Sequence, residues 1–324
     1  MKAMVLAAGL GTRLRPLTYE LPKPMVPVLD RPVMAHIVDL LDRHGYEQVI
    51  ANLHYFPDTI RDYFGDRLVY REEPELLGTA GGVRNCADFL DDDTFLIISG
   101  DALTDIDLDA FVARHKAAGG IGTLAVKRVE NTREFGVVLH DADGRITGFQ
   151  EKPDPAEALS DLGNCGMYLF EPEIFDYFPR EPFVDWANDV FPALLANDVP
   201  FHIHEIGEYW NDVGSLQELK EGTFDAMRGE LRGEEVAEGV RICEGTELTD
   251  ATLIEPPVWI GRDVQIAPGV RLQGPLAIGD GVTIGEGAAL KDSVVLPGTE
   301  IAPHSILIGA IAGSTGIVER LPTR

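Results

Sequence analysis

The sequence predicts an α/β fold with a mostly parallel sheet, followed by a β-solenoid. Over residues 1–230, short apolar runs alternate with helical patterns, and strands that alternate with helices form a mostly parallel sheet covered on both faces. After about residue 232, aliphatic residues recur at every sixth position, which is typical of a solenoid. We therefore expect two domains, residues 1–232 and 233–324, with the segment 229–239, rich in Glu and Gly, as the boundary.

The elements of the first domain follow from the period of the apolar residues. Strands are predicted over residues 4–8, 49–53, 68–71, 95–99 and 123–126. Helices are predicted over residues 32–44, 79–90, 108–118 and 215–228. A hairpin is predicted for strands 137–140 and 146–149, because the residues Asp-Ala-Asp-Gly between them form tight turns readily.

The repeat of the second domain has a strict register. The six-residue series is Ile242, Leu248, Ile254, Ile260, Ile266, Leu272, Ile278, Ile284, Leu290, Leu296, Ala302 and Ile308. A second series lies four residues after many of these: Val258, Val264, Val270, Leu276, Val282, Val294 and Ile306. The pattern resembles the hexapeptide repeats of left-handed parallel β-helices, in which three hexads close one triangular coil. His304 could serve as an acyl-transfer base in such a fold, but no other acyl-transfer feature accompanies it, so we expect a stabilising and assembly module.

Composition excludes several classes of function. The apolar fraction is 45% and the formal charge is −27, which argues against affinity for nucleic acid or anionic membranes. Apolar runs are far shorter than the roughly 20 residues of a membrane helix. Three widely spaced cysteines indicate neither a disulfide framework nor a metal knuckle. We expect a cytoplasmic protein whose anionic ligands are held by local cations and backbone N–H groups.

A candidate phosphate-binding loop follows the first strand. Gly9-Leu-Gly11-Thr12-Arg13 is followed by Lys23 between two prolines. Glycines let the backbone approach phosphates, and successive N–H groups of such a loop form an anion-binding nest. Leu14 stands where a dinucleotide fingerprint has Gly, and no Gly-Lys-Ser/Thr of a Walker loop follows.

This loop and further motifs resemble the signature of sugar-1-phosphate nucleotidyltransferases (sugar-nucleotide pyrophosphorylases), a family with a Rossmann-like catalytic domain. The further matches are Leu77-Gly78-Thr79-Ala80-Gly81, Ser99-Gly100-Asp101, Phe135-Gly136-Val137-Val138, Glu151-Lys152-Pro153, Asn164-Cys165-Gly166-Met167-Tyr168 and Trp210-Asn211-Asp212-Val213-Gly214. Together they cover most of the chain up to residue 214. Within the family, the nearest resemblance is to the mannose-1-phosphate guanylyltransferases. Ser99 and Cys165 replace the usual Asn and Ala, and neither change removes a charge.

The resemblance implies a role for each motif. The first loop would hold the nucleotide with Ala8, Gly9, Gly11 and Thr12, and the residues Gly78, Thr79 and Ala80 would form the wall around the base and ribose. Arg13 and Lys23 would be the catalytic cations. Gly136, Glu151, Lys152 and Asn164 would bind the sugar phosphate, and Asp101 and Asp212 would bind Mg²⁺. The implied partners are a nucleoside triphosphate, a sugar 1-phosphate and further copies of the chain in a homo-oligomer.

The implied reaction transfers a nucleoside monophosphate to a sugar 1-phosphate and releases pyrophosphate, with GTP and mannose 1-phosphate as the implied pair. UTP, dTTP or ATP with glucose 1-phosphate or a related sugar is the open alternative. Two other classes of protein are alternatives. A glycosyltransferase would use the Asp105-Ile-Asp107 motif, which capping of the next helix also explains. A non-catalytic regulatory subunit would be expected to lack Lys23, Asp101 or Asp212, and all three are present.

Overall fold

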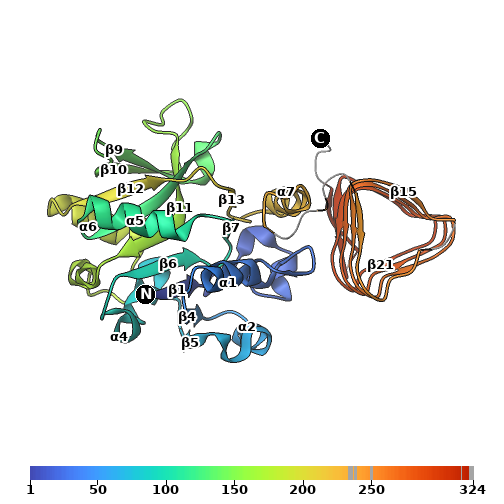
Figure 1. Cartoon of the computed structure of the whole chain (residues 1–324), viewed down its shortest axis with the longest axis horizontal. Helices are drawn as coiled ribbons and strands as arrows, with labels where there is room; N and C mark the ends of the chain where they lie inside the picture. The colour runs from blue at the N-terminus through green and yellow to red at the C-terminus, as the bar shows by residue number, and fades with distance from the viewer. Residues whose placement is uncertain (233–235, 237–238, 249–250, 315, 321–324) are drawn as a thin grey trace. The chain divides into compact units, whose positions relative to one another are not determined.

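The computed structural model describes residues 1–232, 236, 239–248, 251–314 and 316–320 (Figure 1). Contacts divide the chain into two compact units. The first unit comprises Met1–Leu10, Pro22–Pro24 and Ile37–Trp210, and the second comprises Gly11–Leu21, Met25–His36 and Asn211–Arg324. Part of the predicted boundary, residues 233–235 and 237–238, lies outside the described residues.

The first unit is built on one mixed sheet. Its strands are β1 (Lys2–Leu6), β4 (Gln48–Leu53), β5 (Val69–Glu72), β6 (Phe95–Ser99), β8 (Gly122–Arg128), β9 (Gly136–His140), β10 (Ile146–Glu151), β11 (Leu162–Phe170) and β12 (Phe201–Glu205). The order is β10-β9-β11-β6-β1-β4-β5, and β8 pairs with β11 and β12. Strands β6, β1, β4 and β5 are parallel, whereas β11 runs antiparallel to both β6 and β8. The mostly parallel sheet that the sequence predicted is confirmed.

Helices lie in the connections between these strands, as the alternating pattern predicted, and a last helix follows β12 and belongs to the second unit. They are α1 (Val33–Arg43), α2 (Pro57–Phe64), α3 (Gly78–Arg84), α4 (Ala87–Leu90), α5 (Leu108–Ala118), α6 (Phe191–Ala196) and α7 (Leu216–Met227); short strands are β2 (Pro27–Val28), β3 (Arg31–Pro32), β7 (Leu103–Thr104) and β13 (Trp210–Asn211). The single helix predicted over residues 79–90 was wrong. Cys86 leaves the helical region of backbone conformation and is fully buried in the core, so α3 ends and α4 begins around it.

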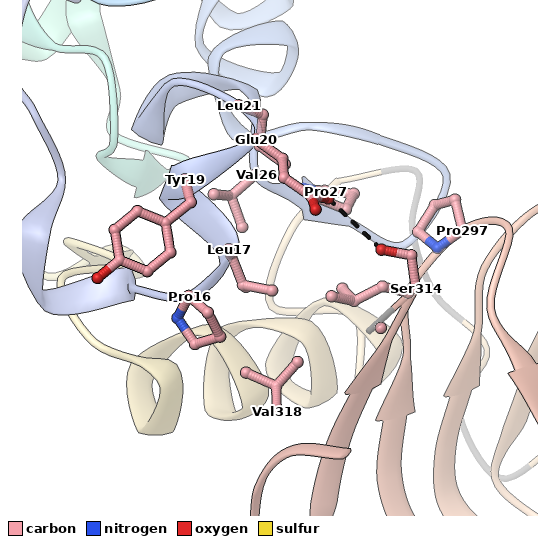
Figure 2. Close-up of a pocket in the computed structure, with 12 residues that line it drawn as sticks. Pro16, Leu17, Tyr19, Glu20, Leu21, Val26, Pro27, Pro297, Ser314 and Val318 are labelled. Atoms are coloured by element: carbon pink, nitrogen blue, oxygen red, sulfur yellow. Dashed lines mark hydrogen bonds between the residues drawn. The ribbon is translucent and has the colours of Figure 1, made fainter. Parts of the chain in front are cut away.

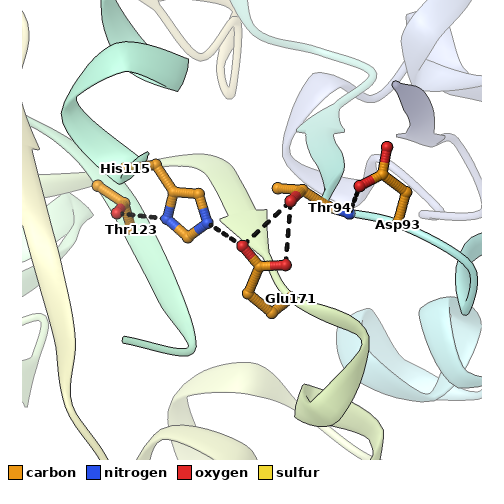
Figure 3. Close-up of polar contacts among 5 residues, drawn as sticks. All are labelled: Asp93, Thr94, His115, Thr123 and Glu171. Carbon is orange, nitrogen blue, oxygen red and sulfur yellow. Dashed lines mark hydrogen bonds and ion pairs between the residues drawn. The ribbon is translucent and has the colours of Figure 1, made fainter. Parts of the chain in front are cut away.

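A partly buried polar network helps to fix the sheet beside α5 (Figure 3). The His115 ring is bonded to the Thr123 hydroxyl at 2.9 Å and to the Glu171 carboxylate at 3.0 Å. The Thr94 hydroxyl donates to the same carboxylate. Because a buried polar group is costly without a partner and these are paired, the network stabilises the packing of α5 against β8 and the end of β11.

The second unit contains stacked, mostly parallel strands with a triangular outline (Figure 1). These are β14 (Val240–Ile242), β15 (Leu253–Glu255), β16 (Val258–Ile260), β17 (Gln265–Ile266), β18 (Arg271–Ile278), β19 (Thr283–Ile284), β20 (Ala289–Val295), β21 (Glu300–Ile301), β22 (Ile306–Ile308), β23 (Ala310–Gly313) and β24 (Gly316–Arg320). The interior is the predicted aliphatic series from Val258 to Leu290. Strand β24 closes the series by pairing antiparallel with β23.

The strict six-residue register was wrong beyond Asp292. Leu272 pairs with Leu290, eighteen residues later, but Leu290 pairs with Leu307, seventeen residues later. One residue is lost near Asp292, so the interior continues at Val295, Ile301 and Leu307 instead of one position further on. Leu307 is 3% exposed, whereas the predicted interior residue Ile308 is 50% exposed. Ala302 and His304 are also exposed.

The second unit also contains an apolar cavity of about 270 Å³ (Figure 2). Leu17 and Val26 line it from the chain near the first loop, and Leu296 and Val318 line it from the coils. The Ser314 hydroxyl donates to the Glu20 carboxylate at 3.4 Å across this cavity. No helix in the part of the chain that the structure describes is long and apolar enough to span a membrane.

Candidate active site

A pocket of about 240 Å³ opens in the first unit where β1 and β6 end. Open α/β sheets bind ligands at the carboxyl ends of their strands. The lining residues are Leu6, Ala8, Gly9, Lys23, Pro24, Asn52, Glu73, Leu76, Gly78, Thr79, Ser99, Asp101 and Phe183. The structure thus brings together the predicted residues Ala8, Gly9, Lys23, Gly78, Thr79 and Asp101. We call this cavity the Lys23 pocket.

Lys23 and Asp101 form an ion pair on the wall of the Lys23 pocket, and both side chains are largely buried. The end of β6 makes this possible. The Gly100 N–H donates to the Leu6 carbonyl at 2.8 Å, and a Cβ on Gly100 would lie 2.7 Å from that oxygen. Only glycine allows this approach of the two strand ends, and it places Asp101 beside the loop that follows β1.

Two polar residues of the pocket were not predicted. Asn52 and Glu73 are each only 3% exposed. The Asn52 amide donates to Glu73 Oε1 at 2.7 Å and accepts from the Ala7 N–H at 2.9 Å, and the Leu77 N–H donates to Glu73 Oε2 at 3.2 Å. An Asn inside the apolar run 49–53 was the available signal, because a polar residue in a buried strand requires a partner.

The start of α3 forms one wall of the Lys23 pocket, and residues 184–185, about 100 positions later in the chain, hold it in place. The N–H groups of Ala80 and Gly81 donate to the Val184 carbonyl at 3.0 and 2.9 Å. Gly78 has φ +82°, and a Cβ there would lie 2.4 Å from the same oxygen. The Thr79 hydroxyl donates to the Asp185 carboxylate at 2.7 Å. Ala80 is fully buried and contributes no side chain to the pocket lining.

The predicted sugar-phosphate residues lie at one end of three neighbouring strands. Glu151 on β10 is opposite Gly136 on β9, and Val137 is opposite Gly163 on β11, so Asn164 follows on the next position. The Asn164 amide donates to the Tyr168 hydroxyl at 3.0 Å. Lys152, half exposed, has its ammonium 3.7 Å from the Glu151 carboxylate.

The strand β11 connects this group with the Lys23 pocket. Gly166 has φ +68°, and a Cβ there would lie 2.6 Å from the hydroxyl oxygen of Ser99, which lines the pocket. The predicted nucleotide and sugar-phosphate residues of the first unit therefore occupy adjoining parts of one sheet edge.

Four predicted residues belong to the second unit: Gly11, Thr12, Arg13 and Asp212. Gly11 has φ +61° and begins a short 3-10 turn, Thr12–Leu14, and its carbonyl accepts from the Thr18 hydroxyl at 2.8 Å. The Arg13 guanidinium lies against Gly214, where a Cβ would be 2.8 Å from it. The pairing of Asp101 with Asp212 on one metal remains a prediction.

The chemistry of Asp101 fits a divalent cation. Mg²⁺ binds through carboxylates together with substrate phosphates, and the Asp101 carboxylate already attracts the Lys23 ammonium in the pocket. The two aspartates of the Asp105-Ile-Asp107 motif make structural contacts instead. Asp107 is the N-cap of α5, accepting from the Ala110 N–H at 2.9 Å, and Asp105 pairs with Arg43 at 2.8 Å. Neither lines the Lys23 pocket.

Comparison with known proteins decides the family. The family described as nucleotidyl transferase matches residues 2–228. The chain belongs to this family. A second description, bacterial transferase hexapeptide (six repeats), matches residues 257–292, and that match ends at the residue where the six-residue register is lost. Both the family and the repeat class predicted from the sequence motifs are confirmed.

Individual relatives differ in the base and sugar that they use. The chain is 40% identical over 253 residues to a UTP–glucose-1-phosphate uridylyltransferase of Synechocystis, covering 72% of this chain and 64% of that protein. It is 36% identical over 234 residues to a mannose-1-phosphate guanylyltransferase of Mycobacterium tuberculosis, covering 70% and 65%. The chain thus spans just under two thirds of the length of these curated relatives.

A solved structure shares the fold. HddC from Yersinia pseudotuberculosis matches 68% of this chain and 97% of its own with a TM-score of 0.60, at 23% identity. This likeness concerns the fold alone.

Proposed function

We propose that the chain transfers a nucleoside monophosphate from a nucleoside triphosphate to a sugar 1-phosphate, and that GTP and mannose 1-phosphate are its preferred pair. Membership of the nucleotidyl transferase family supports the reaction class. The observation that carries the proposal is the Lys23 pocket, in which a cation and a carboxylate face each other beside the glycine loop at the strand ends.

The proposed reaction is a direct displacement. A phosphate oxygen of the sugar 1-phosphate attacks the α-phosphorus, the bond from that phosphorus to the oxygen that bridges to the β-phosphate breaks, and pyrophosphate leaves. Both substrates are anions, so the protein must lower their repulsion and hold them in line. Lys23 and Arg13 would stabilise the charge that builds on the α-phosphate and the departing pyrophosphate.

A metal would assist this chemistry. Mg²⁺ bound by Asp101 and Asp212 would neutralise charge on the triphosphate. Lys152 would hold the incoming sugar phosphate, and Glu151, Asn164 and the Gly136 backbone would contact the sugar. No side-chain nucleophile is required.

The Glu73 carboxylate supports guanine as the base. A carboxylate offers only acceptors. The N1–H and N2–H groups of guanine are adjacent donors, whereas the corresponding edge of uracil presents carbonyl acceptors on both sides of a single N–H. Glu73 is buried in the Lys23 pocket and keeps lone pairs beyond those used by Asn52 and Leu77. An acceptor at this place favours the base with two donors, since a buried polar group left unpaired is costly.

The proposal also covers the role of the repeat coils and the location of the protein in the cell. We assign the coils a stabilising and assembly role in a homo-oligomer, because a solenoid has ends that must be covered. The domain division at residue 232 and a cytoplasmic location are retained from the sequence.

The direct test measures pyrophosphate release with each of five nucleoside triphosphates and several sugar 1-phosphates. We expect the highest kcat/KM for GTP with mannose 1-phosphate. A clear preference for UTP with glucose 1-phosphate, the pair named for the Synechocystis relative, would show that the base assignment is wrong and leave the reaction class intact. Transfer of the sugar from a sugar nucleotide to an acceptor, without pyrophosphate release, would instead support a glycosyltransferase.

A further inference from the structure

A buried ion pair joins helix α7 to the repeat coils. The Lys220 ammonium lies 3.0 Å from Asp292 Oδ2, and the two residues are 3% and 7% exposed. The ammonium also lies 5.6 Å from the centre of the Phe224 ring. Ions lose their hydration on burial and tolerate it only with a well-placed partner. The position of α7 on the coils is therefore tied to the geometry of this pair.

The coils depart from their repeat where they meet Lys220. The residue lost from the eighteen-residue spacing is lost around Asp292, while the preceding coil has Gly274 and Pro275 at the corresponding place. Asp292 itself has φ +46°, a conformation that non-glycine residues seldom adopt. The contraction and the left-handed backbone coincide with an acidic side chain that contacts Lys220.

The start of α7 is equally constrained. Val213, directly after Asp212, is fully buried and has φ +35°, which is unusual for a β-branched residue. The Val213 N–H donates to Asn211 Oδ1 at 2.8 Å, and the Asn211 amide donates to the Glu218 carbonyl at 3.2 Å. Strained backbone of this kind persists only when its surroundings hold it. At Val213 these surroundings are the first turn of α7, which Asn211 contacts through the Glu218 carbonyl.

The same turn also sets the place of Arg13. The Ser215 hydroxyl caps α7 by accepting from the Glu218 N–H at 3.2 Å. Gly214, just before this cap, packs directly on the Arg13 guanidinium. A movement of α7 would therefore shift Arg13 and Asp212 together. Lys220 lies little more than one helical turn from Ser215, about 7.5 Å along the axis.

We propose that the Lys220–Asp292 ion pair is a positioning device for the transfer reaction: it fixes α7 on the coils and so holds Arg13 and Asp212 in their working places. The inference rests on the proposed function of these two residues. It gives the repeat coils a part in turnover that does not require any coil residue to touch a substrate.

The test compares variants of the full-length chain at a temperature where each is folded. Asp292→Asn should lower kcat for pyrophosphate release about tenfold to a hundredfold, because small misplacements of catalytic groups have effects of this size, with KM for both substrates within about twofold of the parent value. Lys220→Arg keeps the charge and the partner Asp292, so it should retain most of the parental kcat. Lys291→Ala, next to Asp292 but exposed and outside the pair, is the matched control and should behave as the parent.

A second measurement is independent of activity. Hydrogen exchange of the amides of residues 213–219 should be faster in Asp292→Asn than in the parent, and unchanged in Lys291→Ala. If Asp292→Asn does not fold, the double variant Lys220→Met with Asp292→Leu replaces the pair by apolar side chains, which buried pairs often tolerate. That variant should be stable and still have the lowered kcat.

The outcomes separate the two proposals. A folded Asp292→Asn or apolar double variant with parental kcat and parental exchange overturns the positioning role and leaves the reaction untouched. A parent protein that releases no pyrophosphate with any substrate pair defeats the proposed function. In that case the exchange measurement alone decides whether the ion pair fixes the start of α7.

Discussion

The Lys23 ammonium contacts the Asp101 carboxylate directly on the wall of the Lys23 pocket. One residue follows the first loop and the other follows β6, so the pair marks the place where the two strand ends meet. A substrate phosphate or a metal ion that enters must compete with, or add to, this existing pair. The predicted metal dependence and the predicted role of Lys23 follow from that competition.

Activity should require Mg²⁺ and Asp101. Excess chelator should abolish pyrophosphate release, and added Mg²⁺ should restore it. Asp101→Asn removes a ligand charge and should lower kcat on the order of 10²–10³-fold, while circular dichroism shows an intact fold; Asp212→Asn should act in the same direction. Asp109→Asn, an exposed carboxylate on α5, is the control. Full turnover in chelator would contradict the metal requirement.

Lys23 and Lys152 should have separable kinetic effects. Lys23→Ala should mainly lower kcat, because the positive charge of Lys23 stabilises the negative charge that grows in the transition state. Lys152→Ala should mainly raise KM for the sugar 1-phosphate, with KM for the nucleotide little changed. Steady-state kinetics with each substrate varied in turn check both. A parental rate in Lys23→Ala, or an effect of Lys152→Ala on the nucleotide alone, would show that the assignment is wrong.

Glu73→Gln should weaken the preference for GTP. The amide replaces one acceptor by a donor, which repels a guanine N–H and attracts a uracil carbonyl. We expect the ratio of kcat/KM for GTP over UTP to fall about tenfold or more. Glu72→Gln, its neighbour, which pairs with Arg61, should leave the ratio unchanged. An equal ratio in both variants would remove Glu73 from base selection.

The interior of the last coils can be tested with adjacent substitutions. Leu307→Asp places a charge in the interior and should destabilise the coils by about 3 kcal/mol or more. Ile308→Asp, at a half-exposed position, should cost less than about 1 kcal/mol. Thermal unfolding of both variants reports the difference. The reverse order would restore the strict six-residue register beyond Asp292.

The cysteines should differ in reactivity at pH 8. Burial raises the pKa of the Cys86 thiol to about 12, and Cys165 is buried as well. Alkylation needs the thiolate and access. Mass spectrometry after brief alkylation of the native protein should therefore show modification at Cys243 before the other two, and at all three after unfolding. Rapid labelling of Cys86 in the native protein would contradict its burial.

Much of the fold and half of the pocket could be predicted from sequence patterns. Strand β6 and helix α5 have the predicted bounds, because apolar runs and caps are local signals. Ala8, Gly9, Lys23 and Asp101 were predicted because their motif is contiguous or lies at a strand end. Asn52 and Glu73 were missed because each is stabilised in the pocket by a hydrogen bond to the other, and the two residues are far apart in the sequence. The split of the helix at Cys86 was missed for a similar reason, since burial of that thiol depends on tertiary packing.

The single residue lost at Asp292 limits how the coils can be exchanged. Coils before it share an eighteen-residue module, so one could be duplicated or swapped for another with its inward side chains still facing inward. Coils after it follow a seventeen-residue step. Suppose a coil from before Asp292 were joined to a coil from after it without the one-residue shortening. Val295 and Leu307 would then face outward. Growth of the array by duplication would therefore need eighteen-residue units before Asp292 and seventeen-residue units after it.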